Sequence, residues 1–135
     1  MVDDVVFNKV AIIERCIRRI QEEYQGNFSN LENYTKQDSI ILNIQRACEA
    51  SIDLAMHLVA SKSLGIPQSS RDAFDFLQQV GIIDEQLALK LKAMVGFRNI
   101  AVHNYQTVNL GIVQGIIEKN LADLLKFGKL VLSTQ

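Results

Sequence analysis

The sequence predicts an all-α protein: an up-down antiparallel bundle of four long helices and one short helix, forming a single domain over residues 1–135. Apolar residues recur at spacings of three and four over long segments, and only one proline is available to interrupt them. No segment has the apolar–polar alternation of a half-buried strand. A chain of this length can bury a sizeable core, so no second domain is required.

The first helix is expected from Asp3 to Tyr24, because apolar residues recur there every seven positions. Gly26 is expected to end it. Arg15, Arg18 and Arg19 cluster on this helix at spacings of three and four. Two interpretations stay open: a solvated face with neighbouring glutamates, or a patch that binds phosphates or a protein partner.

The second helix is expected to begin at Thr35 and Asp38, which resemble a capping box, and to run to about Lys62. Its apolar residues form two adjacent rows, and such a wide stripe indicates burial on two sides at the centre of a bundle. His57 lies among apolar neighbours. A structural histidine is the preferred interpretation, because no second ligand or carboxylate has an evident spacing to it.

Three further helices are each expected to follow a capping residue. The caps are Ser69 or Ser70 for the short helix, Asp84 for the next helix and Asn109 for the last. The short helix, residues 71–79, should turn Phe74, Leu77 and Val80 inward. The last helix should end near Leu132.

The bulk properties exclude several classes of protein. The net charge is −1, so any nucleic-acid binding must come from a local patch rather than from a basic field. Cys16 and Cys48 fall on apolar helix faces and are interpreted as small buried residues, not a disulfide or a metal site. No metal and no cofactor are expected. The absence of a long apolar run or a leader predicts a cytoplasmic protein without a membrane segment.

Residues 94–105 form the most unusual stretch, because an arginine falls on an apolar helix row. Arg98 continues a row that should be core, and a desolvated guanidinium is costly unless it is paired. It should therefore pair with a carboxylate such as Asp53 or Glu49, line a cleft, or face a second subunit. His103 lies about 140° further around an ideal helix, so either the helix loosens or another surface completes the site.

Arg98, His103 and Tyr105 resemble the R-x4-H-x-Y signature of the HepT-type toxins, a branch of the HEPN superfamily. Three further stretches, residues 13–20, 37–55 and 67–74, are similar to the same family in the same order. The resemblance therefore spans nearly the whole chain.

The resemblance implies a helical-bundle endoribonuclease that acts as a homodimer with a composite site. Arg98 and His103 would be catalytic, and Asn99 would orient the phosphate or the histidine. The resemblance also implies a partner, a small nucleotidyltransferase antitoxin of the MNT type, which transfers AMP from ATP onto Tyr105 in a type VII-like HepT/MntA toxin–antitoxin system. The family often has aspartate between the histidine and the tyrosine, where this chain has Asn104.

The chemistry agrees with that implication. Cleavage of RNA by its own 2′-OH needs a base, an acid and a cation that holds the charge of the phosphorane. One arginine and one histidine supply only part of this set, whereas a twofold dimer would supply two of each. Metal-independent cleavage of mRNA or tRNA is predicted. The alternative is a non-catalytic helical subunit that binds nucleotide or presents substrate to a nucleotidyltransferase. RNA or the antitoxin would bind at Arg15, Arg18, Arg19 and Arg46.

Overall fold

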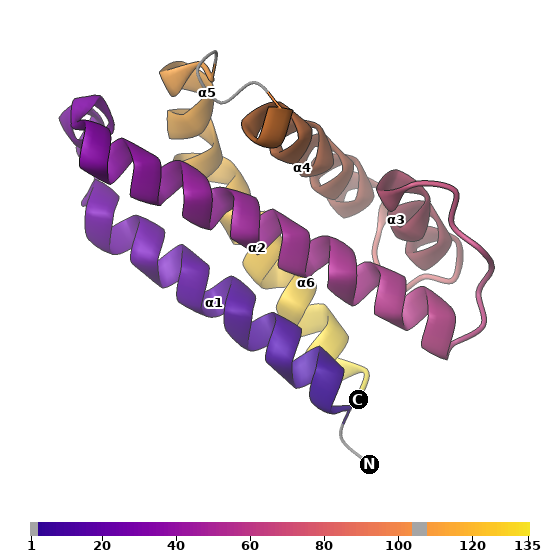
Figure 1. Cartoon of the computed structure of the whole chain (residues 1–135). Helices are drawn as coiled ribbons and strands as arrows, with labels where there is room; N and C mark the ends of the chain where they lie inside the picture. The colour runs from indigo at the N-terminus through magenta and orange to yellow at the C-terminus, as the bar shows by residue number, and fades with distance from the viewer. Residues whose placement is uncertain (1–2, 104–107) are drawn as a thin grey trace.

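The computed structural model describes residues 3–103 and 108–135, and within them the backbone is helical without any strand (Figure 1). The elements are α1 (Asp4–Tyr24), a 3₁₀ turn (Phe28–Glu32), α2 (Tyr34–Ser61), α3 (Ser70–Gln79), α4 (Glu85–His103), α5 (Leu110–Gly115), a π-helical segment (Ile116–Asn120) and α6 (Leu121–Ser133). The all-α bundle prediction is confirmed. No helix of the described residues is long and apolar enough to cross a membrane.

The long helix α2 lies at the centre of the bundle (Figure 1). α1 packs along one side of it, α3 and α4 pack along the other, and α6 contacts α1, α2 and α4. This arrangement confirms that the wide apolar stripe of α2 is buried on two sides. Edge-to-face packing of Phe74 on Phe127, with ring centroids 5.7 Å apart, joins α3 to α6 in the same core.

Most of the predicted helix starts are confirmed, because capping is a local interaction. Asp3 caps α1, and its Oδ1 accepts a hydrogen bond from the Val5 amide at 3.0 Å. Ser69, Asp84 and Asn109 were predicted as caps, and they precede α3, α4 and α5 respectively.

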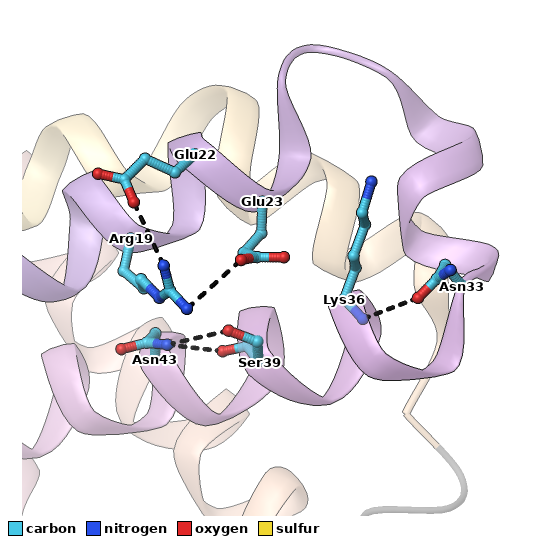
Figure 2. Close-up of polar contacts among 7 residues, drawn as sticks. All are labelled: Arg19, Glu22, Glu23, Asn33, Lys36, Ser39 and Asn43. Atoms are coloured by element: carbon cyan, nitrogen blue, oxygen red, sulfur yellow. Dashed lines mark hydrogen bonds and ion pairs between the residues drawn. The ribbon is translucent and has the colours of Figure 1, made fainter.

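The predicted N-cap of α2 was wrong. Asn33, not Thr35, precedes the helix, and Figure 2 shows its Oδ1 accepting a hydrogen bond from the Lys36 amide at 3.0 Å. Asparagine is at least as good an N-cap as threonine, and Asn33 comes first along the chain. The residues proposed as a capping box therefore lie inside the first turns of α2.

Two other details differ from the sequence prediction. Val80 is 52 % exposed, because α3 ends at Gln79 and the chain turns away through Gly81, whose φ is +79°. The last helix is not regular, since its α-helical parts are joined by the π-helical segment Ile116–Asn120. Between α1 and α2 the chain forms a 3₁₀ turn, which buries Leu31.

His57 has a structural partner, as the preferred interpretation expected. Its Nε2 lies 2.6 Å from Asp3 Oδ2, so the histidine on α2 holds the residue that caps α1. The sequence analysis found no carboxylate for His57 because Asp3 is 54 positions away. Cys16 and Cys48 are both free and buried, as predicted.

Candidate active site

Arg98 lies on α4 where that helix packs against α2. Its row neighbours Leu91, Met94 and Ala101 are buried, whereas Arg98 itself is only half-buried. The guanidinium lies close enough to Cys48 of α2 to influence its thiol: burial raises the pKa of Cys48 to about 12, and the charge of Arg98 opposes that rise. Arg98 therefore stands at the edge of the core with its charged head toward solvent.

Neither of the carboxylates suggested as partners neutralises Arg98. Asp53 pairs with Lys9 of α1 at 3.2 Å, and Glu49 accepts a hydrogen bond from Gln45 at 3.1 Å. Within residues 3–103 and 108–135, Arg98 forms no ion pair with any carboxylate. An ion pair of Arg98 with a carboxylate of the described part of its own chain is therefore excluded, and a cleft or a second subunit remains.

Asn99 holds the guanidinium of Arg98. Its Oδ1 accepts a hydrogen bond from Arg98 Nε at 3.0 Å, and the side chain of Asn99 is exposed. The sequence analysis expected Asn99 to orient a phosphate or the histidine, but the contact in this chain is with the arginine. Among the described residues Arg98 donates only through Nε, so its two outer nitrogens can form a fork for a phosphate.

His103 is the last residue of α4, and it is exposed. The helix does not loosen between Arg98 and His103, so the two side chains leave it about 140° apart, with Asn99 between them. One chain thus provides a single imidazole, although the cleavage chemistry needs both a base and an acid. Asn104 and Tyr105 lie outside the described residues.

The structure does not bring the arginine cluster of α1 to this site, because α1 and α4 lie on different sides of α2 (Figure 1). Arg19 pairs with Glu22 at 3.4 Å and with Glu23 at 3.6 Å (Figure 2), which is the solvated-face arrangement. Arg15 and Arg18 are exposed on α1. Arg46 lines a shallow groove between α1 and α2, beside Lys9, Ile12, Glu49, Ala50 and Asp53.

One side chain near the motif was missed by the sequence analysis. Arg71 of α3 extends to α4, where its Nε donates a hydrogen bond to the Lys92 carbonyl oxygen at 3.4 Å. Its Nη2 lies 3.0 Å from the place that a Cβ on Gly96 would occupy. A glycine inside an otherwise regular helix was the only available signal, and it does not identify the side chain that uses the space.

The described residues contain no group of three or more histidine, cysteine, aspartate and glutamate side chains arranged to hold a metal ion. The polar groups of the candidate site are instead a guanidinium, an amide and an imidazole, all on α4. Guanidinium binds phosphate oxygens in a fixed fork, and imidazole titrates near neutral pH. This set suits a phosphodiester better than a divalent cation.

Comparison with known proteins identifies the family. Residues 13–131 match the sequence profile of the family described as ribonuclease HepT-like. The mRNA nuclease HepT of Shewanella oneidensis is 50 % identical over 125 residues, which cover 93 % of this chain and 94 % of that protein. Two solved structures have the same fold.

The first is the tri-AMPylated HEPN toxin of Shewanella oneidensis in complex with MNT antitoxin, with 48 % identity, a TM-score of 0.91, and coverage of 98 % of this chain and 99 % of that chain. The second is a toxin–antitoxin complex that carries a tyrosine-to-alanine substitution, with 46 % identity, a TM-score of 0.89, and coverage of 96 % and 98 % respectively. The similarity in sequence and in fold extends over nearly the full length. The chain therefore belongs to the HepT-like ribonuclease family of HEPN proteins.

Proposed function

We propose that this chain is the toxin of a HepT/MntA toxin–antitoxin pair of the type VII kind, and that it cuts RNA without a metal ion at a site shared by two copies of the chain. The observation that carries the proposal is the accessible pair on α4: a guanidinium held by Asn99 with no carboxylate partner among the described residues, and an exposed imidazole at His103. Membership of a ribonuclease family favours this function over a non-catalytic subunit.

The proposed reaction is attack by the 2′-oxygen of the RNA on its own neighbouring phosphorus. His103 of one copy takes the 2′-OH proton as the O2′–P bond forms, and His103 of the second copy gives a proton to the 5′-oxygen as the P–O5′ bond breaks. Arg98 binds the non-bridging oxygens and stabilises the charge that develops on the phosphorane. The products are a 2′,3′-cyclic phosphate and a 5′-OH. The S. oneidensis relative is named an mRNA nuclease, which favours mRNA over tRNA as the substrate.

The surface around the pair supports a second copy as the completing partner. Ile100 and Val102 lie between Arg98 and His103 on α4, yet they are 48 % and 47 % exposed. Exposed apolar side chains next to polar groups are typical of a protein interface. A twofold axis beside α4 would cover these side chains and would place two guanidinium groups and two imidazoles in one cleft.

Regulation is proposed to act at Tyr105, two positions after His103. A relative was solved in tri-AMPylated form with its MNT antitoxin. We propose that the cognate antitoxin uses ATP to place AMP on the Tyr105 oxygen, where the added phosphate and base would occupy the place of the RNA. Arg15, Arg18 and Arg46 remain candidates for contact with RNA or the antitoxin. We propose that the protein acts in the cytoplasm, where both RNA and ATP are present.

The test of catalysis compares the two histidines of the chain. Purified protein is incubated with single-stranded mRNA in EDTA, as wild type, His103→Ala and His57→Gln. We expect wild type and His57→Gln to cleave, because His57 contacts Asp3 and not the site, and His103→Ala to lose at least about a hundredfold in rate. No cleavage by any variant would support the non-catalytic subunit. Cleavage that EDTA abolishes would contradict the metal-free mechanism.

The test of regulation is mass spectrometry of the chain after co-expression with its antitoxin. AMP is expected on the peptide that contains Tyr105, and the same peptide of Tyr105→Phe should be unmodified. The modified protein should not cut RNA. An unmodified Tyr105 in a fully neutralised complex would show that this antitoxin works in another way.

A further inference from the structure

We propose that Arg71 is an additional RNA-binding residue: its guanidinium, held over Gly96 on α4, binds a backbone phosphate close to the one that is cut. This inference rests on the proposed ribonuclease function and extends it from the scissile phosphate to the neighbouring strand. Three observations on the described residues support it. Arg71 is held against α4, it forms no ion pair with the nearby carboxylates, and it reaches the face of α4 that carries His103.

Arg71 is held against α4 although it belongs to α3. Its Nε donates to the Lys92 carbonyl oxygen at 3.4 Å, and its Nη2 lies over Gly96, only 3.0 Å from where a Cβ would be. A glycine inside a helix lets another group approach closely, because it has no Cβ. The group that approaches is this guanidinium, so the glycine leaves space for a charged side chain from the same chain.

The nearby carboxylates of α3 are used by other groups. Asp75, four positions after Arg71, would be its natural partner along the helix, but Asp75 accepts from Lys92 Nζ at 2.8 Å. Asp72 accepts from the Gln68 amide at 2.9 Å. In the part of the chain that the structure describes, Arg71 therefore has no ion pair.

The position of Arg71 is also unfavourable for α3 itself. It lies in the first turn of the helix, where the N-terminal end of the helix dipole disfavours a cation. An exposed, unpaired arginine at this point adds little to the stability of the helix. Its charge remains available for a ligand, and the most direct ligand beside a ribonuclease site is a phosphate.

The guanidinium of Arg71 reaches the same face of α4 as His103. Gly96, Asn99 and His103 are spaced by three and four, so they share one face. Gly96 and His103 differ by about 20° around the helix and by about 10 Å along it. The hydrogen bond from Arg98 to Asn99 ties the second guanidinium to this face. A strand of RNA whose scissile phosphate lies at Arg98 and His103 would pass Arg71 with a neighbouring phosphate.

The test measures binding without cleavage, in a His103→Ala background. The Kd for single-stranded RNA is measured by fluorescence anisotropy over a range of salt concentrations. Adding Arg71→Ala should raise the Kd roughly tenfold. It should also reduce the slope of log K against log salt by about 0.7, the change expected for one lost phosphate contact on a single strand. Arg71→Gln, which retains a donor for the Lys92 carbonyl, should give the same loss.

The matched control is Lys129→Ala, which removes one positive charge from the exposed surface of α6 and should leave both the Kd and the slope unchanged. Thermal unfolding confirms that each variant is folded. If Arg71→Ala and Arg71→Gln bind RNA like their parent while Arg98→Ala does not, this inference is overturned and the proposed function stands. If they weaken only the complex with the antitoxin, it is also overturned. Failure of the parent to bind any RNA would overturn the proposed function itself.

Discussion

Asn99 lies between the two catalytic candidates and contacts one of them, Arg98. It stands between Arg98 and His103 along the chain and around the helix, and its amide oxygen fixes the guanidinium through a 3.0 Å hydrogen bond. The R-x4-H spacing predicts Arg98 and His103 as the catalytic pair, and that assignment stays a prediction. The role of Asn99 could not be predicted, because the spacing does not specify the rotamer that an arginine adopts.

Contacts between residues far apart in the sequence could not be predicted either. Asp3 and His57 are 54 positions apart, and neither position alone indicates the other. Arg71 and Gly96 likewise meet only because α3 packs on α4. Such contacts depend on how the helices dock, which the local sequence pattern does not encode.

The contact between Asp3 and His57 predicts a pH dependence of stability. The hydrogen bond from His57 has the largest effect on the pKa of Asp3 and lowers it. Burial opposes this effect, and the hydrogen bonds from the Val6 and Val5 amides lower the pKa further, so the net result is a pKa below the ordinary value. A carboxyl with a lowered folded pKa stabilises the fold above its unfolded pKa, and that contribution is lost as the pH falls through the folded pKa. Asp3→Asn keeps a good N-cap but has no charge, so it should remove this pH-dependent contribution to stability.

Urea unfolding at a series of pH values checks this prediction. The free energy of unfolding of wild type should exceed that of Asp3→Asn by a constant amount above about pH 5, and the difference should shrink below about pH 4. Asp4→Asn, which removes a charge from the first turn of the same helix, controls for the helix dipole. A difference between wild type and Asp3→Asn that does not change with pH would mean that the ionised carboxylate is not what stabilises this contact.

The elements were predictable to the extent that their signals are local. Caps such as Asp84 and Asn109 bond to amides two or three positions away, so the sequence identifies them. Asn33 was overlooked because Thr35 offered a competing signal within two residues. The π-helical segment could not be predicted, since apolar spacing in Ile116–Asn120 suits a regular helix as well.

Two glycines inside helices should respond oppositely to substitution by alanine. At Gly96 the added Cβ meets only the tip of Arg71, a flexible side chain, so the gain in helix propensity of about 0.5–1 kcal/mol should stabilise the protein. At Gly128 the Cβ would lie 3.3 Å from Val10 Cγ1, in the buried contact between α1 and α6. At that position, overpacking should destabilise the protein by about 1–3 kcal/mol, which is more than the gain in helix propensity.

Thermal or urea unfolding of Gly96→Ala and Gly128→Ala measures both effects against wild type. The two variants add the same atom to the same kind of backbone, so each serves as the control for the other. Stabilisation of Gly128→Ala would show that α6 can shift away from Val10 at little cost. Destabilisation of Gly96→Ala would show that the side chain of Arg71 cannot move away from the added Cβ without cost.

At the scale of the molecule, the order of the helices and the central place of α2 followed from periodicity and from the width of its apolar stripe. What the sequence pattern could not reveal is which surface would contact the proposed second copy. Sequence periodicity marks residues that avoid water, but it does not distinguish a core from an interface. Exposed Ile100, Val102 and Ile112 show that part of the apolar surface beside the motif remains uncovered in a single chain.

A shared site predicts a non-linear loss of activity on mixing. Wild type is refolded or co-expressed with the double variant Arg98→Ala/His103→Ala, so that mixed dimers form. If each cleft needs both copies, an equal mixture should keep about one quarter of the activity, since only the wild-type pairs cut. Independent sites would keep one half in the same mixture. Wild type mixed with tagged wild type controls for losses in handling, and a strictly linear decline would contradict the shared cleft.

The buried thiol of Cys48 has a practical consequence. It is only 2 % exposed, its pKa is raised to about 12, and it lies beneath Arg98 where α2 meets α4. In the closed protein it is neither ionised nor reachable, so an alkylating reagent such as iodoacetamide can modify it only in molecules whose two helices have separated. Because Cys16 is also a free buried thiol, the modification is measured on the peptide that contains Cys48. The rate at which that peptide gains mass would then report how often α2 and α4 separate beneath Arg98.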